Sequence, residues 1–199
     1  VEVVDISQID FDAIRRRFQQ GKKRTEIERL RALLTAKLAE MVARNPTRAD
    51  FLERFKRLID RYNDGSLNIE ALLKALQEFT EDLSAAEQEA VREELSEEEK
   101  AVFDILTRPE PELTSSERER VKAAARSLLK NLKAEKLVLD WRKKTQAKNA
   151  VRHAIEIVLD RELPEDPYGK DLFDAKCTAI YRHVYDSYHG GGRSVYAAG

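Results

Sequence analysis

The spacing of apolar residues is the feature that most constrains the fold of this 199-residue chain. Almost everywhere, apolar side chains recur at positions i, i+3, i+4 and i+7, the period of an α-helix that buries one face. Between Thr25 and Arg44 the stripe consists of Ile27, Leu30, Leu34, Leu38 and Met41. The chain also has only 7 Gly and 5 Pro, too few turn residues for a fold of many strands. We therefore predict an all-α fold, a multi-helix bundle in two packed helical subdomains.

Hydroxyl residues that stand three positions before a glutamate predict where helices begin. In this arrangement the two side chains satisfy free backbone N–H groups at the helix start. The chain has three such pairs: Ser84 with Glu87, Ser96 with Glu99, and Thr114 with Glu117. The stiffest break is the Arg108-Pro109-Glu110-Pro111 stretch, because a proline disfavours helix at the residue before it.

These signals divide the chain into five expected segments. They are a linker from a preceding domain (1–9), an N-terminal helical subdomain (10–108), a second linker (109–113), a C-terminal helical subdomain (114–189) and a flexible, glycine-led tail (190–199). Since the first residue is Val1 and not methionine, we expect the sequence to be a fragment of a longer polypeptide.

Charge and composition limit the classes of function. The 36 basic residues nearly cancel the 37 acidic ones, so a role in nucleic-acid binding needs a local basic patch. A single cysteine, Cys177, excludes an internal disulfide and suits a reducing compartment. No apolar run approaches the length of about 18 residues that crosses a bilayer. We expect a soluble, cytoplasmic protein without a membrane partner.

Two basic clusters are the candidate binding sites for DNA or for a partner protein. The first cluster contains Arg15, Arg16, Arg17, Lys22, Lys23 and Arg24. The second contains Trp141, Arg142, Lys143, Lys144, Lys148 and Arg152. Both could neutralise phosphates, but a run of charges on a helix is more often simply a solvated face, and this is the alternative for each cluster. We expect Trp141 to be a half-buried anchor at the start of its helix, and not a platform for stacked bases.

Two further groups of residues fit a protein partner. From Glu78 to Glu99 there are ten acidic residues and one base, Arg92, which suits a basic partner surface or one of the two basic clusters. Tyr181, Tyr185 and Tyr188 could supply buried aromatic contacts in an interface, or they could belong to the protein core.

The sequence offers no catalytic or metal site. The Asp60–Asn68 turn resembles a calcium loop, but Tyr62 and Ala71 stand where oxygen ligands are required. The three histidines lack metal-binding spacing, and no phosphate-binding glycine loop or nucleophile elbow occurs. We therefore predict no catalytic, cofactor-binding or metal-binding residue in this chain.

The sequence resembles the C-terminal helical region of the restriction (R) subunit of type I restriction-modification enzymes. The resemblance covers nearly the whole chain through several blocks that occur in the same order: VVDISQIDFDAI (3–14), KKRTEIERLRALL (22–34), NPTRADFLERFKRLIDRYNDGSLNIE (45–70), LSEEEKAVFDILTRPEPELTSSERERVK (95–122), LVLDWRKKTQAKNAVRHAIE (137–156) and FDAKCTAIYRHVYDSY (173–188). The most specific features are the LDWRKK segment and the tyrosine-rich HVYDSY end.

The resemblance implies a parent subunit with a nuclease domain and two motor domains that use ATP and magnesium to translocate DNA. Residues 1–9 would then leave the second motor domain, and none of the parent's catalytic motifs falls in this chain. It implies a non-catalytic docking module that holds the motor and nuclease onto the methyltransferase and specificity subunits. As a docking module, the chain would reach DNA only through the parent complex. One alternative is a helical module that contacts the DNA backbone directly during translocation. The other is a helical scaffold that is unrelated to restriction enzymes.

Overall fold

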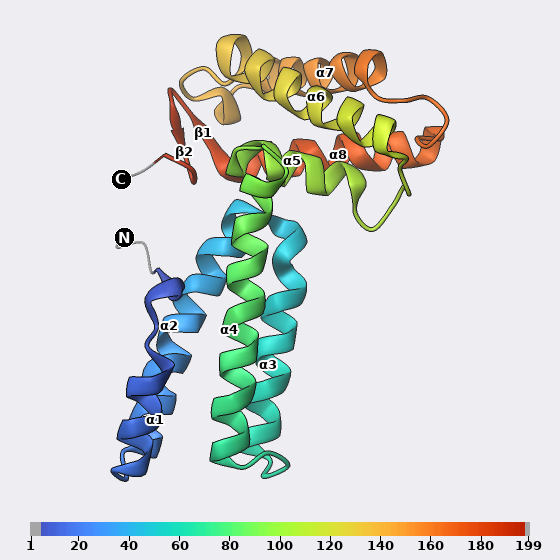
Figure 1. The fold of residues 1–199 in the computed structure, drawn as a ribbon. Helices are drawn as coiled ribbons and strands as arrows, with labels where there is room; N and C mark the ends of the chain where they lie inside the picture. The colour runs from blue at the N-terminus through green and yellow to red at the C-terminus, as the bar shows by residue number, and fades with distance from the viewer. Residues whose placement is uncertain (1–4, 198–199) are drawn as a thin grey trace. The chain divides into compact units, whose positions relative to one another are not determined.

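A computed structural model describes residues 5–197 and confirms the all-α prediction. Figure 1 shows the elements in chain order. The α-helices are α1 (Phe11–Gln19), α2 (Lys23–Arg44), α3 (Ala49–Asn63), α4 (Ile69–Arg92), α5 (Glu97–Thr107), α6 (Ser115–Asn131), α7 (Thr145–Glu162) and α8 (Lys170–Ser187). Short helical turns are η1 (Ile6–Gln8), η2 (Pro46–Arg48), the π-helical η3 (Leu132–Lys136) and η4 (Trp141–Lys143). A small antiparallel hairpin joins β1 (Tyr188–Gly190) and β2 (Arg193–Ser194).

The helices form two compact units whose division differs from the expected one. Within residues 5–197, the first unit holds residues 5–42 and 48–92, and the second holds residues 43–47 and 93–197. The proline-rich stretch 109–113 therefore lies inside the second unit. It is a loop between α5 and α6, and the Nζ of Lys176 on α8 holds its start by donating hydrogen bonds to the carbonyls of Ile105 and Arg108 at 2.9 and 2.8 Å.

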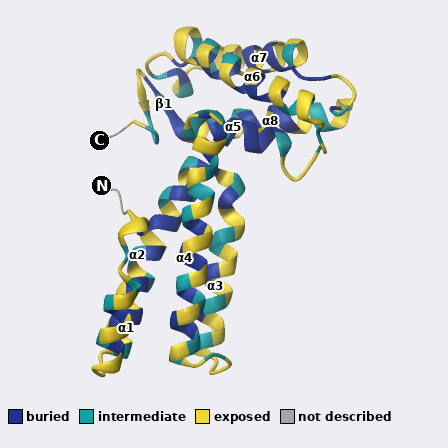
Figure 2. Ribbon diagram, viewed as in Figure 1, coloured by how far each residue is buried: buried dark blue, intermediate teal, exposed yellow. Residues whose placement is uncertain are grey.

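The first unit buries the apolar stripes of α1 to α4 in one core. In Figure 2 the buried residues form stripes along these helices, and their other faces are exposed. The turn between α1 and α2 uses Gly21 at a φ of +84°, a backbone conformation that suits glycine. The core of this unit comprises Ile6, Ile14, Phe18, Ile27, Leu30, Leu34, Leu38, Met41, Phe55, Ile59, Leu72, Leu73, Leu76, Phe79 and Leu83.

Of the three predicted helix starts, two are confirmed and one is wrong. Ser96 and Thr114 both form the reciprocal hydrogen bonds with the glutamate three positions later. Ser84 instead lies inside α4, which continues from Ile69 to Arg92. The apolar stripe runs on through Phe79 and the fully buried Leu83, so packing keeps the helix intact across the serine.

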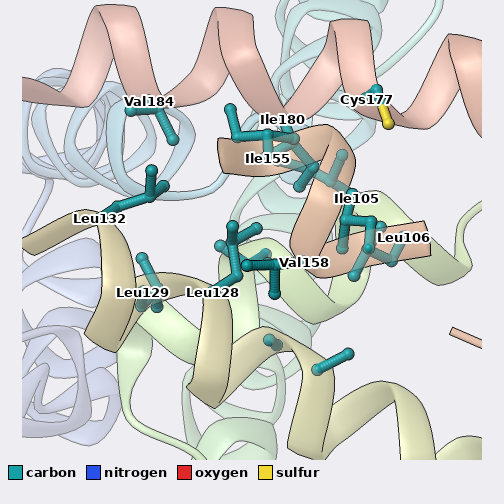
Figure 3. Packing of buried hydrophobic residues seen from close by; sticks show 14 of the residues in the cluster. Ile105, Leu106, Leu128, Leu129, Leu132, Ile155, Val158, Cys177, Ile180 and Val184 are labelled. Carbon is teal, nitrogen blue, oxygen red and sulfur yellow. The ribbon is translucent and has the colours of Figure 1, made fainter. Parts of the chain in front are cut away.

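The second unit packs α5, α6, α7 and α8 around its own core. Figure 3 shows how side chains of all four helices meet there. The labelled residues are Ile105, Leu106, Leu128, Leu129, Leu132, Ile155, Val158, Cys177, Ile180 and Val184. Cys177 is a buried free thiol, and burial raises its pKa to about 12, so it contributes packing and not reactivity.

The end of the chain is more ordered than its glycine content suggests. The predicted flexible tail began at Gly190, but β1 and β2 pair with each other, with Tyr188 opposite Ser194. Tyr196 is half-buried, and its hydroxyl lies 3.0 Å from Nε2 of His183. Residues 198–199, like residues 1–4 of the expected linker, lie outside the described part of the chain.

Candidate functional site: a basic groove between α7 and α8

An open groove of about 640 Å³ lies between α7 and α8 in the second unit. Each helix lines it with residues spaced i, i+3, i+4 and i+7, which places them on one helical face. The lining residues are Thr145, Lys148, Asn149 and Arg152 on α7, and Thr178, Tyr181, Arg182, Tyr185 and Asp186 on α8.

Arginine guanidinium groups cover both tyrosine rings at the groove. The Arg152 guanidinium lies 4.0 Å from the centre of the Tyr181 ring, a distance at which a cation is attracted to the ring face. Arg142 lies 5.5 Å from the centre of the Tyr185 ring and donates a hydrogen bond to the Tyr185 carbonyl at 3.1 Å. The two rings are 6.2 Å apart. The structure thus brings Arg142, Lys148 and Arg152 of the second basic cluster and two of the three tyrosines to one surface.

The positive charge of the groove is not neutralised locally. Within residues 5–197, Lys148, Arg152 and Arg182 form no ion pair within 4.0 Å. Asp186 is the one carboxylate that lines the groove, against these three cations. Such a surface attracts a ligand or a protein surface that carries negative charge.

Two predicted binding residues belong to the core. Trp141 was expected to be half-buried, but it is fully buried, and its Nε1 donates to the Tyr188 carbonyl at 3.0 Å. Tyr188 is 3% exposed and its hydroxyl donates to Glu98 at 2.9 Å. Burial raises the pKa of the Tyr188 hydroxyl, and the charge of Glu98 adds to this effect. Of the two alternatives for Tyr188, an interface contact or a core residue, its position is therefore that of a core residue.

Lys143 and Lys144 of the second cluster are not among the residues that line the groove. Lys143 is exposed and pairs with Asp140 at 3.0 Å. Lys144 is exposed at the residue that precedes α7. Trp141, which was expected at the start of its helix, instead lies in the short turn η4, and α7 begins at Thr145. Asp140, just before η4, adopts a left-handed conformation with a φ of +58°.

The first basic cluster is largely neutralised by carboxylates of its own unit. Arg15 pairs with Asp12 at 2.6 Å, Arg17 with Glu26 at 2.8 Å, and Lys23 with Glu70 at 2.5 Å. Arg16 is 3.9 Å from Asp10, whereas Lys22 and Arg24 are exposed. This cluster lies at the turn between α1 and α2 and retains less free positive charge than the α7–α8 groove.

The acidic segment from Glu78 to Glu99 includes carboxylates that pair with bases outside the two basic clusters. Glu87 pairs with Lys37 at 2.6 Å, and Asp82 pairs with Arg54 at 2.6 Å. In the second unit, Glu98 pairs with Lys133 at 2.5 Å. The pairs join helices of the same unit, so part of this acidity stabilises the fold.

Sequence reasoning missed Arg182, which contributes one of the groove's three cations. It is not part of a run of basic residues, because Lys176 is six positions before it on α8, so no cluster of charges marks it. Its signal was the spacing: Thr178, Tyr181, Arg182 and Tyr185 repeat on α8 the i, i+3, i+4, i+7 pattern of the α7 residues.

No site for a metal ion is present in the part of the chain that the structure describes, because no three His, Cys, Asp or Glu residues form a suitable group. Among residues 5–197, no helix is both long and apolar enough to traverse a lipid bilayer.

Comparison with known proteins places the chain in a family. The family described as "Type I restriction enzyme HindI endonuclease subunit-like, C-terminal" matches residues 1–185. A putative type I restriction enzyme MjaIXP endonuclease subunit from Methanocaldococcus jannaschii is 25% identical over 139 residues. This match covers 67% of the present chain and 13% of the relative's length. No solved structure matches significantly. Since the family match covers most of the sequence, the chain belongs to the family of C-terminal regions of HindI-like type I restriction enzyme endonuclease subunits.

Proposed function

We propose that this region docks the endonuclease subunit of a type I restriction enzyme onto the methyltransferase and specificity subunits. The observation that carries the proposal is the α7–α8 groove, which presents unpaired cations and two arginine-covered tyrosines on one surface. Tyrosine and arginine are enriched among the residues that contribute most to protein–protein affinity. In this proposal ATP hydrolysis and DNA cleavage belong to other parts of a longer subunit, which would use ATP and magnesium.

Co-elution tests the docking role. The 199-residue chain is mixed with a purified methyltransferase–specificity complex and passed over a size-exclusion column. Docking predicts that the two elute together, and that Tyr181→Ala with Tyr185→Ala weakens the association. Both rings are partly exposed, so the variant should keep its fold. Separate elution of the unmodified chain would contradict the proposal.

A second candidate function is contact with the DNA backbone, and the three unpaired cations favour it. Lys148, Arg152 and Arg182 could each neutralise a phosphate, and threonine and asparagine side chains beside them could donate hydrogen bonds to phosphate oxygens. Binding of this kind weakens steeply with salt, because each neutralised phosphate releases counterions.

Charge reversal separates the two functions. Lys148→Glu, Arg152→Glu and Arg182→Glu are combined in one variant, and duplex binding is followed by gel shift at low and moderate salt. The matched control reverses three exposed cations of the first cluster, with Arg16→Glu, Lys22→Glu and Arg24→Glu, and changes the net charge equally. Contact through the groove predicts loss in the first variant alone. Absence of a shift with the unmodified chain would exclude the second candidate.

A further inference from the structure

Two apolar side chains lie in solvent on the short loop that joins η3 to η4. Val138 is 50% exposed and Leu139 is 60% exposed. They are adjacent in the chain, so they form one protrusion, which we call the Val138–Leu139 knob. Single exposed apolar residues are ordinary on protein surfaces, so exposure alone says little. The backbone that carries these two residues is more informative.

The knob is held rigidly from several sides. The backbone N–H of Trp141 donates a hydrogen bond to the Val138 carbonyl at 3.2 Å, and the backbone N–H of Gly191 donates one to the Leu137 carbonyl at 3.2 Å. A Cβ on Gly190 would lie 2.3 Å from the Val138 oxygen, so only glycine allows this approach. Asp140 takes a left-handed conformation with a φ of +58° directly after the knob. Such restraints hold the backbone that presents two apolar side chains to water before any partner arrives, which lowers the entropy cost of binding.

The surroundings of the knob are basic. Lys143 and Lys144 follow it in the chain, and Arg193 stands on the adjacent hairpin; all three are exposed. Asp140 is the neighbouring carboxylate, and Lys143 already pairs with it at 3.0 Å. The hydrogen bond and charge of Lys143 lower the pKa of Asp140, and the charges of Arg193 and Lys144 add to this effect.

We propose that the Val138–Leu139 knob is an apolar anchor that inserts into an apolar pocket bordered by carboxylates on a partner protein. The inference rests on the docking function proposed above and names the surface and the chemistry of the partner. A protein fits better than DNA, since valine and leucine side chains offer nothing to phosphates and a protein pocket can bury them. Symmetric pairing of two copies through this loop would bring like charges together, which disfavours it.

The test removes the apolar surface and keeps the charges. Binding of the 199-residue chain to the methyltransferase–specificity complex is measured by titration calorimetry for the unmodified chain and for Val138→Ser with Leu139→Ser. We expect at least a tenfold loss of affinity in the double variant. Leu139→Met should keep most of the affinity, since it preserves an apolar side chain of similar volume. The matched control is Ile157→Ser, which removes an apolar residue of α7 that is 49% exposed, and it should leave affinity unchanged.

Each other outcome has a defined meaning. If the unmodified chain binds and the double variant binds equally well, the anchor is refuted and the docking function stands. If the unmodified chain does not bind the complex at all, both are refuted. Light scattering could instead show that the unmodified chain forms a dimer and that the double variant does not. This result would overturn the proposed partner, because the knob would then bind a second copy of the chain. Leu139→Ser alone serves as the test variant if the double variant loses the native circular dichroism spectrum.

Discussion

The indole Nε1 of Trp141 donates a hydrogen bond to the backbone carbonyl of Tyr188, 3.0 Å away, inside the second unit. Trp141 is fully buried and Tyr188 is 3% exposed, so neither group has access to bulk water. The bond connects η4 to β1, two elements 47 positions apart in the chain. Together with the edge contact between the rings of Trp141 and Tyr185, it ties the loop before α7 to the end of α8.

Replacing Trp141 by phenylalanine tests how much this hydrogen bond contributes to the stability of the fold. The variant keeps an aromatic ring but leaves the Tyr188 carbonyl buried without its donor, and it opens a small cavity. We expect a loss of about 2–3 kcal/mol in the free energy of unfolding. Urea denaturation followed by circular dichroism measures it. Tyr185→Phe is the control, because Tyr185 is 37% exposed, and its stability should stay within about 0.5 kcal/mol of the parent.

The glycines after β1 allow a comparison between steric clash and backbone strain. Gly190 and Gly192 both have positive φ angles, +85° and +77°. A Cβ at Gly190 would meet the Val138 carbonyl at 2.3 Å, whereas a Cβ at Gly192 would meet nothing within 4 Å.

Gly192→Ala should therefore cost only the strain of a left-handed backbone, about 1 kcal/mol. Gly190→Ala should cost at least about 2 kcal/mol more, since the clash is with backbone that must shift. Thermal unfolding of the two variants gives the difference. Equal midpoints would show that the hairpin does not press against the Val138 loop.

The helical architecture could be predicted because each core residue repeats at a helical period, as Leu30, Leu34 and Leu38 do on α2. The tail could not. Gly190 reads as a flexible residue in the sequence, and its order depends on Val138 and Trp141, which are distant in the chain. Local signals also do not show when packing overrides them, as at Ser84, where the buried Leu83 continues the stripe.

The same limit applies to the candidate site. Lys148 and Arg152 could be selected because they belong to a run of basic residues, and α7 does present them to the groove. Trp141 and Tyr188 could not be separated from Tyr181 and Tyr185 by residue type, since a buried and an exposed aromatic look alike in a sequence. The neutralisation of Lys23 by Glu70 joins residues 47 positions apart, so it also required the fold.

The two confirmed capping pairs and the unconfirmed one make a further test. Ser96 and Thr114 accept hydrogen bonds from the backbone N–H of Glu99 and Glu117. Ser96→Ala and Thr114→Ala should each destabilise the protein by about 1 kcal/mol. Ser84→Ala should be neutral or slightly stabilising, because alanine has the higher helix propensity inside α4. Chemical denaturation distinguishes these results, and a 1 kcal/mol loss for Ser84→Ala would indicate a helix start that the structure does not contain.

The lowered pKa of the Glu93 carboxyl group leads to a prediction of how the stability of the fold depends on pH. Its carboxylate accepts hydrogen bonds from Arg118 and from Lys122, the latter at 2.7 Å. Burial alone would raise the pKa of Glu93, but these hydrogen bonds and the two positive charges outweigh it and lower the pKa to about 2. The pKa of the unfolded chain stays near the ordinary value of 4.5. Since the folded pKa is depressed, the stabilisation is complete above about pH 5 and is lost as pH falls toward 2.

Glu93→Gln isolates this contribution from that of the other carboxylates. The variant should be less stable than the parent by about 2 kcal/mol at pH 7, and the gap should close as the pH approaches 2. Glu119→Gln is the matched control, because Glu119 also pairs with Lys122 at 2.8 Å but its side chain is 67% exposed. It should change stability by less than about 1 kcal/mol at every pH. Urea denaturation at a series of pH values measures both gaps. A Glu93→Gln gap that is constant from pH 7 to pH 3 would mean that Glu93 stabilises the fold by packing and hydrogen bonding alone, and that its charge contributes nothing.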